Sequence, residues 1–374
     1  MNSVSRYIIG GVAVAVVVFL CWYFSSIIAY VAVAVVISFL GRPLIDRLRR
    51  VKIRGRRLGD GLCAAVTLVC VWLVAIFFFC TVIPLVIHEF RSLSDISVAG
   101  VVNSLDEPLR ELEKGLKYFG IMEDDQNVKD FVVENLSSVL DFSGVKNVFG
   151  SVAGTVSGIF IALFSVSFMA FFFLKDSKLF YRMMIAITPS GYEEGVANAL
   201  DSIQRLLMRY FIGITLEVII VMTLNVVGLS IVGVAFVHAV VIGLITGITN
   251  VIPYLGPILG AVFGLLVGLV THIDMDFNTV LLPMLIYMTI VFCVTQLIDN
   301  IVLQPLIYGN SVYAHPLEIF LVLLVAGNLA GIPGMILAIP GYTVLRVILR
   351  EFFNKYKLVK SLTRGLDVSD SEGK

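Results

Sequence analysis

The sequence predicts an all-α, polytopic membrane protein with about eight transmembrane helices, two of them broken by proline and glycine. Only 14% of its 374 residues are charged, whereas soluble domains carry about 25%. Its mean hydropathy is +0.98, and several uncharged apolar runs exceed the roughly 18 residues that a membrane-spanning helix needs. We therefore expect membrane lipid to surround the chain. The formal net charge of zero gives no indication of nucleic-acid binding, and we expect none.

The first segment, residues 1–60, predicts two short N-terminal spans, Tyr7 to Phe24 and Ile27 to Leu40, followed by a basic loop. Residues 42–57 contain eight Lys or Arg and a single acid, Asp46. Short basic loops between membrane spans stay in the cytoplasm. This loop predicts a multi-pass protein of the cell membrane (the inner membrane in a Gram-negative cell), with both termini cytoplasmic.

Residues 61–175 predict spans 3 and 4, Leu62 to Val86 and Val152 to Leu174, joined by extracytoplasmic amphipathic helices over 88–150. Residues 88–146 carry twelve Asp or Glu against six Lys or Arg, the opposite balance from the basic loop. This segment lies on the membrane, caps the protein in solvent or docks a partner, and the sequence leaves these three alternatives open. A cytoplasmic connector over 176–208 follows, and 351–374 predict a cytoplasmic tail.

Residues 209–350 predict a nearly uncharged transport unit of four spans. No Lys or Arg occurs between Tyr210 and Leu345. The predicted spans are Phe211 to Val232, a broken segment Phe236 to Thr271, Thr279 to Val302, and His315 to Leu349. The broken segment crosses the membrane once unless the last span folds back, and the sequence does not decide between crossing and re-entry.

The break in the second of these spans is the strongest pointer to a site. Pro253 and Pro257 prevent one straight helix from running through it, and open backbone within a bilayer is tolerated only where protein or water satisfies it. We expect Asn250, Pro253, Gly256 and Pro257 to form a substrate pathway or a hinge. After the break, a four-residue repeat of glycines predicts a face for close helix packing; its members are Gly256, Gly260, Gly264 and Gly268.

Further polar residues are grouped in the same unit. Gln296, Asn300 and Gln304 recur every fourth residue beside Asp299, which predicts a polar stripe on one helix face. Asn328 lies beside glycine and proline in the last span, repeating the pattern of the first break. An acid at membrane depth indicates a pathway or a paired site, so Glu217 and Asp299 are candidates for ion coupling. Alternatively, Glu217 pairs with Arg209 and Asp299 is solvated at the interface.

Several short motifs resemble the autoinducer-2 exporter (AI-2E) family of membrane transport proteins. They are Tyr210-Phe-Ile-Gly213, Asn250-Val-Ile-Pro253-Tyr-Leu-Gly256-Pro257, Asp299-Asn300 with Gln304-Pro305 and Gly309, His315-Pro316, and Gly331-Ile-Pro333-Gly334-Met335 through Pro340. The resemblance implies about eight spans, cytoplasmic ends and homo-oligomers. It also implies export of a small polar signal molecule in some members and cation/proton antiport in others.

These features predict a secondary transporter or exporter of a small polar solute, an autoinducer-2-like signal molecule. The alternatives are a Na⁺/H⁺-type cation antiporter and a non-transporting membrane scaffold or assembly factor. We expect neither an enzyme nor a cofactor, because the sequence has no HExxH or GxSxG motif. We also expect no metal site, because its five cysteines form no CxxC pair and its four histidines are scattered.

Overall fold

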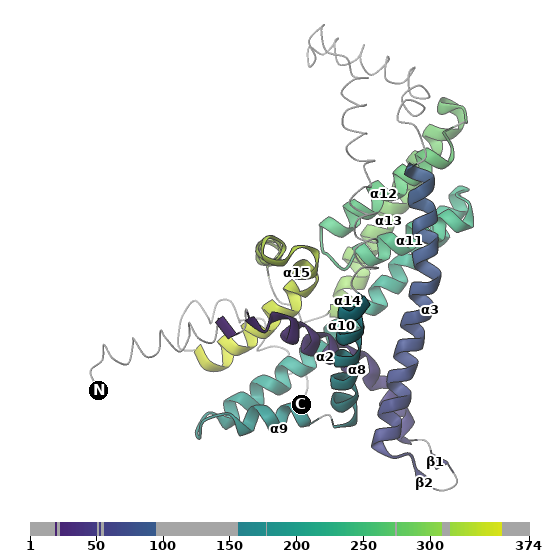
Figure 1. The fold of residues 1–374 in the computed structure, drawn as a ribbon. Helices are drawn as coiled ribbons and strands as arrows, with labels where there is room; N and C mark the ends of the chain where they lie inside the picture. Colours follow the sequence, from purple (N-terminus) through teal and green to yellow (C-terminus); the bar gives the residue numbers. More distant parts are fainter. Residues whose placement is uncertain are drawn as a thin grey trace. The chain divides into compact units, whose positions relative to one another are not determined.

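A computed structural model describes residues 19–20, 23–50, 52–53, 56–94, 156–176, 178–273, 275–308 and 315–353. Within these ranges the chain is helical, apart from one pair of two-residue strands. The prediction of an all-α fold is therefore confirmed (Figure 1). The predicted helix from Tyr7, the extracytoplasmic helices over 88–150 and the tail over 351–374 lie largely outside the described residues.

The chain divides into two compact units, and the first comprises residues 1–76 and 153–204. It contains α2 (Ser25–Arg50), β1 (Lys52–Ile53) paired antiparallel with β2 (Arg56–Arg57), and the first part of α3 (Asp60–Ser94). It also contains α8 (Val156–Lys175), α9 (Leu179–Ala186) and the start of α10 (Glu193–Val232). Its core is formed where α2 packs against α8, with Ala34, Val166 and Ala170 buried.

Helix α2 extends further than its apolar pattern predicts. The sequence predicts its end at Leu40, where the basic loop begins, but the helix continues through Pro43 to Arg50. Ile45 is buried in a second cluster with Cys63 and Leu174. The apolar run ends at Leu40, but the burial of Ile45 stabilises the helix among the arginines that follow.

The second unit comprises residues 77–152 and 205–374. It holds the remainders of α3 and α10, then α11 (Phe236–Thr249), α12 (Leu255–Thr271) and the π-helical segment η1 (Phe277–Leu281). The predicted span Thr279 to Val302 begins within η1 and continues through α13 (Leu282–Ile298) into the π-helical segment η2 (Asp299–Leu303). Helix α14 (Gln304–Tyr308) extends it beyond the predicted end. Finally, α15 covers Pro316–Phe353. Leu229, Ile242, Val267 and Met288 lie at the centre of this unit's core.

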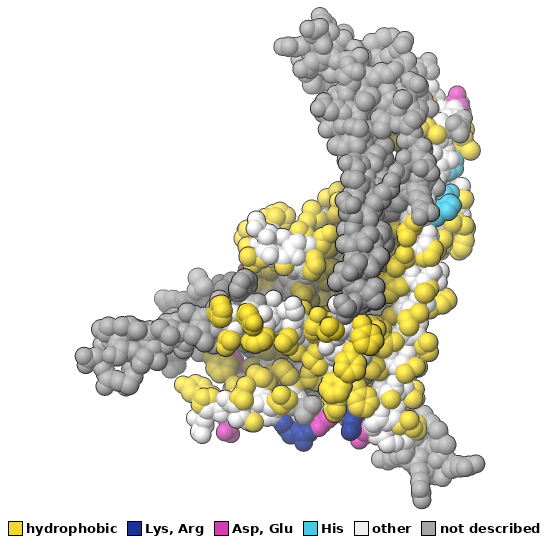
Figure 2. All heavy atoms as spheres, viewed as in Figure 1, with side chains coloured by type: hydrophobic (Ala, Val, Ile, Leu, Met, Phe, Trp, Pro, Cys, Tyr) yellow, Lys and Arg dark blue, Asp and Glu magenta, His cyan; other side chains and the backbone are white. Residues whose placement is uncertain are grey.

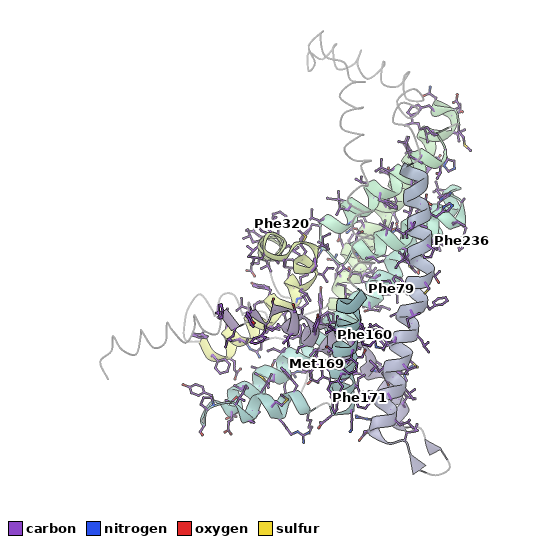
Figure 3. The ribbon with its side chains drawn as sticks, viewed as in Figure 1. Phe79, Phe160, Met169, Phe171, Phe236 and Phe320 are labelled. Atoms are coloured by element: carbon purple, nitrogen blue, oxygen red, sulfur yellow. The ribbon has the colours of Figure 1, made fainter. Side chains whose placement is uncertain are left out.

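Hydrophobic side chains cover most of the visible surface of the described residues (Figure 2). Phe79, Phe160 and Phe236, on α3, α8 and α11, are among the exposed aromatic residues (Figure 3). By length and composition, five described helices could cross a membrane, or up to six if the bent pair α8–α9 forms one span. The chain is thus a multi-pass membrane protein, while the count of eight spans stays a prediction.

Helices α11 and α12 form an antiparallel hairpin around the predicted break. A Cβ atom on Gly256 would meet Thr249, one on Gly260 would meet Thr246, and one on Gly264 would meet Ile242. Residue numbers on one arm rise as those on the other fall, which is the pattern of two arms folded back on each other. Glycines allow the backbones to approach closely. The predicted glycine repeat therefore lies between the arms at Gly260 and on α13 at Gly268, which contacts Met288.

Helix α15 folds back in the same way. Its backbone leaves helical geometry at Ala330 and Gly331, where Gly331 has φ of 61°. The Tyr342 hydroxyl donates a hydrogen bond of 2.8 Å to Glu318 Oε2. A straight helix would hold residues 24 positions apart at about 36 Å, so this contact requires the two arms to run antiparallel. Leu323 and Ala338 pack together between the arms, and Ile252 from the α11–α12 turn joins them.

A buried polar pair ties α3 to the beginning of the first hairpin. Glu89 is 1% exposed, although α3 is otherwise almost entirely apolar and little buried. The Nδ1 atom of His238 lies 3.0 and 2.9 Å from the two carboxylate oxygens of Glu89. A carboxylate only accepts hydrogen bonds, so an ionised Glu89 requires a proton on Nδ1. This pair fixes the end of α3 to the first turn of α11.

Candidate functional site

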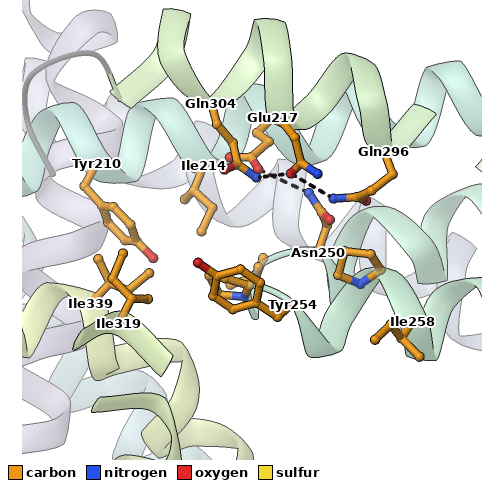
Figure 4. A pocket seen from close by; sticks show the side chains of 14 residues that line it. Tyr210, Ile214, Glu217, Asn250, Tyr254, Ile258, Gln296, Gln304, Ile319 and Ile339 are labelled. Atoms are coloured by element: carbon orange, nitrogen blue, oxygen red, sulfur yellow. Dashed lines mark hydrogen bonds between the residues drawn. The ribbon is translucent and has the colours of Figure 1, made fainter. Parts of the chain in front are cut away.

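A cavity of about 600 Å³ opens in the second unit, between the turn of the α11–α12 hairpin, α10, the α13–α14 segment and both arms of α15 (Figure 4). Its volume lies in the range of small-molecule sites, roughly 300–1,000 Å³. The lining residues are Tyr210, Ile214, Glu217, Asn250, Val251, Pro253, Tyr254, Pro257, Ile258, Gln296, Asn300, Gln304, Ile319 and Ile339.

Two buried carboxylates share one amide beside this cavity. The Nδ2 atom of Asn250 donates to Glu217 Oε1 at 3.2 Å and to Asp299 Oδ2 at 3.4 Å. Glu217, Asn250 and Asp299 are 3%, 7% and 1% exposed. Asn250 is the C-cap residue of α11, so the break in the hairpin carries this amide to residues of α10 and η2.

The polar stripe extends this network along the α13–α14 segment. The Nε2 atom of Gln304 donates to Asp299 Oδ2 at 2.9 Å and to Asn300 Oδ1 at 3.1 Å. Gln296 Nε2 donates to the same Asn300 oxygen at 3.1 Å. The π-helical turn of η2 begins at Asp299 and allows a contact between residues five apart, which an α-helix disfavours. Such π-helical turns occur frequently at functional sites.

The hydrogen-bond directions determine what the wall offers a ligand. The amide hydrogens of Asn250 and Gln304 are donated to Glu217, Asp299 and Asn300, so their amide oxygens remain as acceptors. Asn300 accepts from Gln296 and Gln304 and keeps its own amide hydrogens as donors. Among the described residues, Asp299 Oδ1 is buried and has no hydrogen-bond partner. Burying an ionised carboxylate is costly unless it is paired. The two carboxylates and the amide oxygens of Asn250 and Gln304 therefore suit a proton, a cation or a solute with hydrogen-bond donors.

The turn between α11 and α12 has an unusual backbone. Tyr254 has φ of 66° and ψ of −51°, and the Leu255 N–H donates to the Pro253 carbonyl at 2.8 Å. These values describe a γ-turn of the rare positive-φ type, and such conformations cost on the order of 1–3 kcal/mol at a residue with a side chain. Gly256 follows at once, and any Cβ atom there would overlap the Thr249 carbonyl oxygen. The hairpin closes tightly with a tyrosine at its tip.

The structure brings together most of the predicted site residues. Asn250, Pro253, Pro257, Gln296, Asn300, Gln304 and Glu217 line the cavity, Asp299 lies directly behind them in the network, and Gly256 seals the hairpin turn. Asn328 is the exception: it is exposed near the end of the first arm of α15 and does not line this cavity.

Tyr254 and the isoleucines of α10, α12 and α15 also line the cavity, and the sequence analysis did not select them. The position of Tyr254 between Pro253 and Pro257 was the available signal for it. An isoleucine in an apolar helix gives no such signal, because most isoleucines there face lipid or core.

Comparison with known proteins agrees with this architecture. The sequence pattern of the AI-2E family transporter matches residues 12–354. The chain belongs to the AI-2E transporter family. "Putative transport protein YueF" of Bacillus subtilis (strain 168) is 28% identical over 272 residues, which cover 70% of each chain. "Putative transport protein YrrI" of the same organism is 32% identical over 210 residues, covering 54% of this chain and 56% of the relative. The AI-2E motifs at 250–257 and 299–305 coincide with the hairpin turn and the polar stripe.

Proposed function

We propose that this AI-2E family protein is a secondary transporter that exports a small polar solute through the cavity between its two hairpins. The observation that carries this proposal is the Glu217–Asn250–Asp299 network, a polar group of residues inside a membrane unit that has no Lys or Arg from Tyr210 to Leu345. Polar residues at membrane depth are costly and indicate a pathway or site. Interrupted helices near such residues are typical of the binding sites of secondary transporters.

The chemistry of the wall indicates the class of solute. Carboxylates and amide oxygens accept hydrogen bonds and the Asn300 amide donates them, so together they complement a molecule with several hydroxyl groups. Four isoleucines supply most of the apolar lining: Ile214, Ile258, Ile319 and Ile339. An autoinducer-2-like signal molecule, small and rich in hydroxyls, satisfies both requirements.

The order of the helices supports alternating access by movement of the hairpins against the remaining helices. The α13–α14 segment is one candidate membrane span, and it separates the α11–α12 hairpin from α15. If one membrane crossing lies between two re-entrant hairpins in the sequence, the two hairpins enter the membrane from opposite faces. Arg346 and Arg350 close the second arm of α15, which favours a cytoplasmic base for α15 and an extracytoplasmic base for α11–α12. The sequence has no Walker A motif, so an ion gradient or a partner supplies the energy.

Transport by purified protein in liposomes tests the proposal. Radiolabelled autoinducer-2-like solute and other small polyols are loaded inside, and efflux is measured with and without a pH gradient. We expect efflux that exceeds that of empty liposomes and that Asn250→Leu abolishes. Equal efflux from protein-containing and empty liposomes for every solute and gradient would overturn the proposal.

A cation antiporter is the second candidate, because the two carboxylates share a single amide donor. Glu217→Gln and Asp299→Asn remove one acid each while retaining the shape of the side chain. An antiporter loses cation exchange driven by a pH gradient in both variants. An exporter of a neutral solute that is not coupled to protons retains solute efflux. Cation exchange that is unchanged in both variants excludes these acids from an antiport mechanism.

A further inference from the structure

Tyr254 is more exposed than the amide and acid of the buried network that line the same cavity. It lines the cavity and is 47% exposed, whereas Asn250 and Glu217 are buried beneath it. Its exposure places Tyr254 toward the mouth of the cavity, together with the exposed lining residues Ile258 and Asn300, while the buried amide and acid lie deeper. In Figure 4 the ring of Tyr254 lies across the cavity from Gln304 and Glu217, and its hydroxyl points toward that of Tyr210.

We propose that Tyr254 is the gate of this cavity, controlling access of solute to the Glu217–Asn250–Asp299 network. This inference rests on the proposed function only in naming the cavity as the solute pathway. Tyr210 on α10 is 5% exposed, so its packing fixes it deeper in the cavity as the surface against which the ring closes, while Tyr254 provides the movable side. The width that remains between the two rings then sets an upper limit on the size of the solute.

The backbone at Tyr254 supplies a physical reason for movement. Its positive φ is a conformation that residues with a Cβ atom rarely adopt, and it persists only because neighbouring groups impose it. Pro253 has no backbone N–H, and the Leu255 N–H is held by the Pro253 carbonyl. The turn is also closed by a hydrogen bond of 2.8 Å from the Gly256 N–H to the Ile252 carbonyl. Breaking these two hydrogen bonds would let Tyr254 return to an ordinary φ, which redirects its side chain. The gate requires this second state of the turn, with the ring in a different place.

Access of a thiol reagent tests the gate without any knowledge of the solute. The five native cysteines are replaced by alanine, and Gln296→Cys places a reporter inside the cavity. The full chain in liposomes is treated with a charged, membrane-impermeant maleimide, and the labelling rate is measured. Tyr254→Ala and Tyr254→Gly remove the ring, and Tyr254→Phe keeps it. Tyr287→Ala, at an exposed tyrosine of α13 that does not line the cavity, is the matched control.

Opening of a gate is typically a minor state of roughly 10% or less. We therefore expect Tyr254→Ala and Tyr254→Gly to label about tenfold faster than the reporter protein, since removal of the ring makes the open state permanent. Tyr254→Phe and Tyr287→Ala label at the parent rate, and Tyr254→Trp labels more slowly. The reduced rate with Trp is a separate test that does not depend on the smaller variants folding.

Parent labelling rates in the Ala, Gly and Trp variants overturn the gate, even if liposomes show transport. Faster labelling in the Ala and Gly variants, together with an absence of transport for every solute tried, supports a gated cavity while the transport proposal fails. The two proposals thus fail in different experiments.

Discussion

The two hairpins of the second unit have similar sequence patterns but differ in the contacts of the asparagine near each turn. Each joins two antiparallel apolar arms, and each has an asparagine near glycine and proline. The α11–α12 hairpin turns over several residues and buries Asn250 against two carboxylates. The α15 hairpin turns at Ala330 and Gly331 and leaves Asn328 exposed.

The difference shows that a broken helix joins a buried polar network only where its tip meets polar partners. Asn250 caps α11 at the point where α10 presents Glu217 and η2 presents Asp299. Asn328 lies before its turn, and the described polar contact between the arms of α15 is made at their base, by Tyr342 and Glu318. The first hairpin therefore supplies polar lining to the cavity, and the second supplies an apolar wall through Ile319 and Ile339.

The largest expected effect comes from the tight closure of the first hairpin. Gly256→Val introduces a Cβ atom that overlaps the Thr249 carbonyl, and we expect destabilisation on the order of 4 kcal/mol or more. Gly341→Ala on α15, where nothing lies within 4 Å of the added atom, is the control. Thermal unfolding in detergent measures both, and equal melting temperatures would show that the turn is loosely packed.

Exchange of the two asparagines for leucine compares the tips directly. Asn250→Leu removes the donor to two buried carboxylates, and an unsatisfied buried polar group costs about 1–3 kcal/mol. We expect loss of efflux together with a lower melting temperature. Asn328 is exposed, so Asn328→Leu should change the free energy of unfolding by no more than about 0.5 kcal/mol. A similar loss of efflux in both variants would contradict the assignment of the site to the first hairpin.

We expect a smaller loss of stability from a substitution at the base of the second hairpin. Tyr342→Phe removes the 2.8 Å hydrogen bond to Glu318 and should cost about 0.5–1.5 kcal/mol. The ring, over which the Arg346 guanidinium lies, remains. Tyr287→Phe, at an exposed tyrosine, serves as the control in the same thermal unfolding experiment. A variant as stable as the parent would mean that apolar packing alone holds the arms together.

The smallest effect concerns the entrance to α13. Asp276 accepts hydrogen bonds from the Thr279 hydroxyl and backbone N–H at 2.7 and 2.8 Å, and these bonds lower the pKa of its carboxyl below the usual 3.8. A lowered pKa in the folded state adds stability above the usual pKa, and this stability is lost as pH falls through the folded pKa. Asp276→Asn should flatten the acid limb of a melting-temperature profile slightly. An identical profile in both proteins would contradict the cap.

Sequence patterns predicted the break, the polar stripe and the acids, because each depends on local spacing. Pro253 and Pro257 cannot lie within a continuous helix wherever it packs, and residues four apart share a face. Residues 49 positions apart have no such relation, so no pattern could pair Asn250 with Asp299. The contact of His238 with Glu89, 149 positions away, was equally beyond local reasoning.

The sequence by itself determined that this is a helical membrane protein of the AI-2E family with an interrupted, nearly uncharged second half. Apolar run length, charge placement and proline chemistry act along the chain and need no partner. Tertiary structure alone decided that both interrupted helices fold back, and that one of two similar asparagines reaches the acids. The reason is that packing partners determine these features, and local sequence patterns do not specify which distant residues will meet.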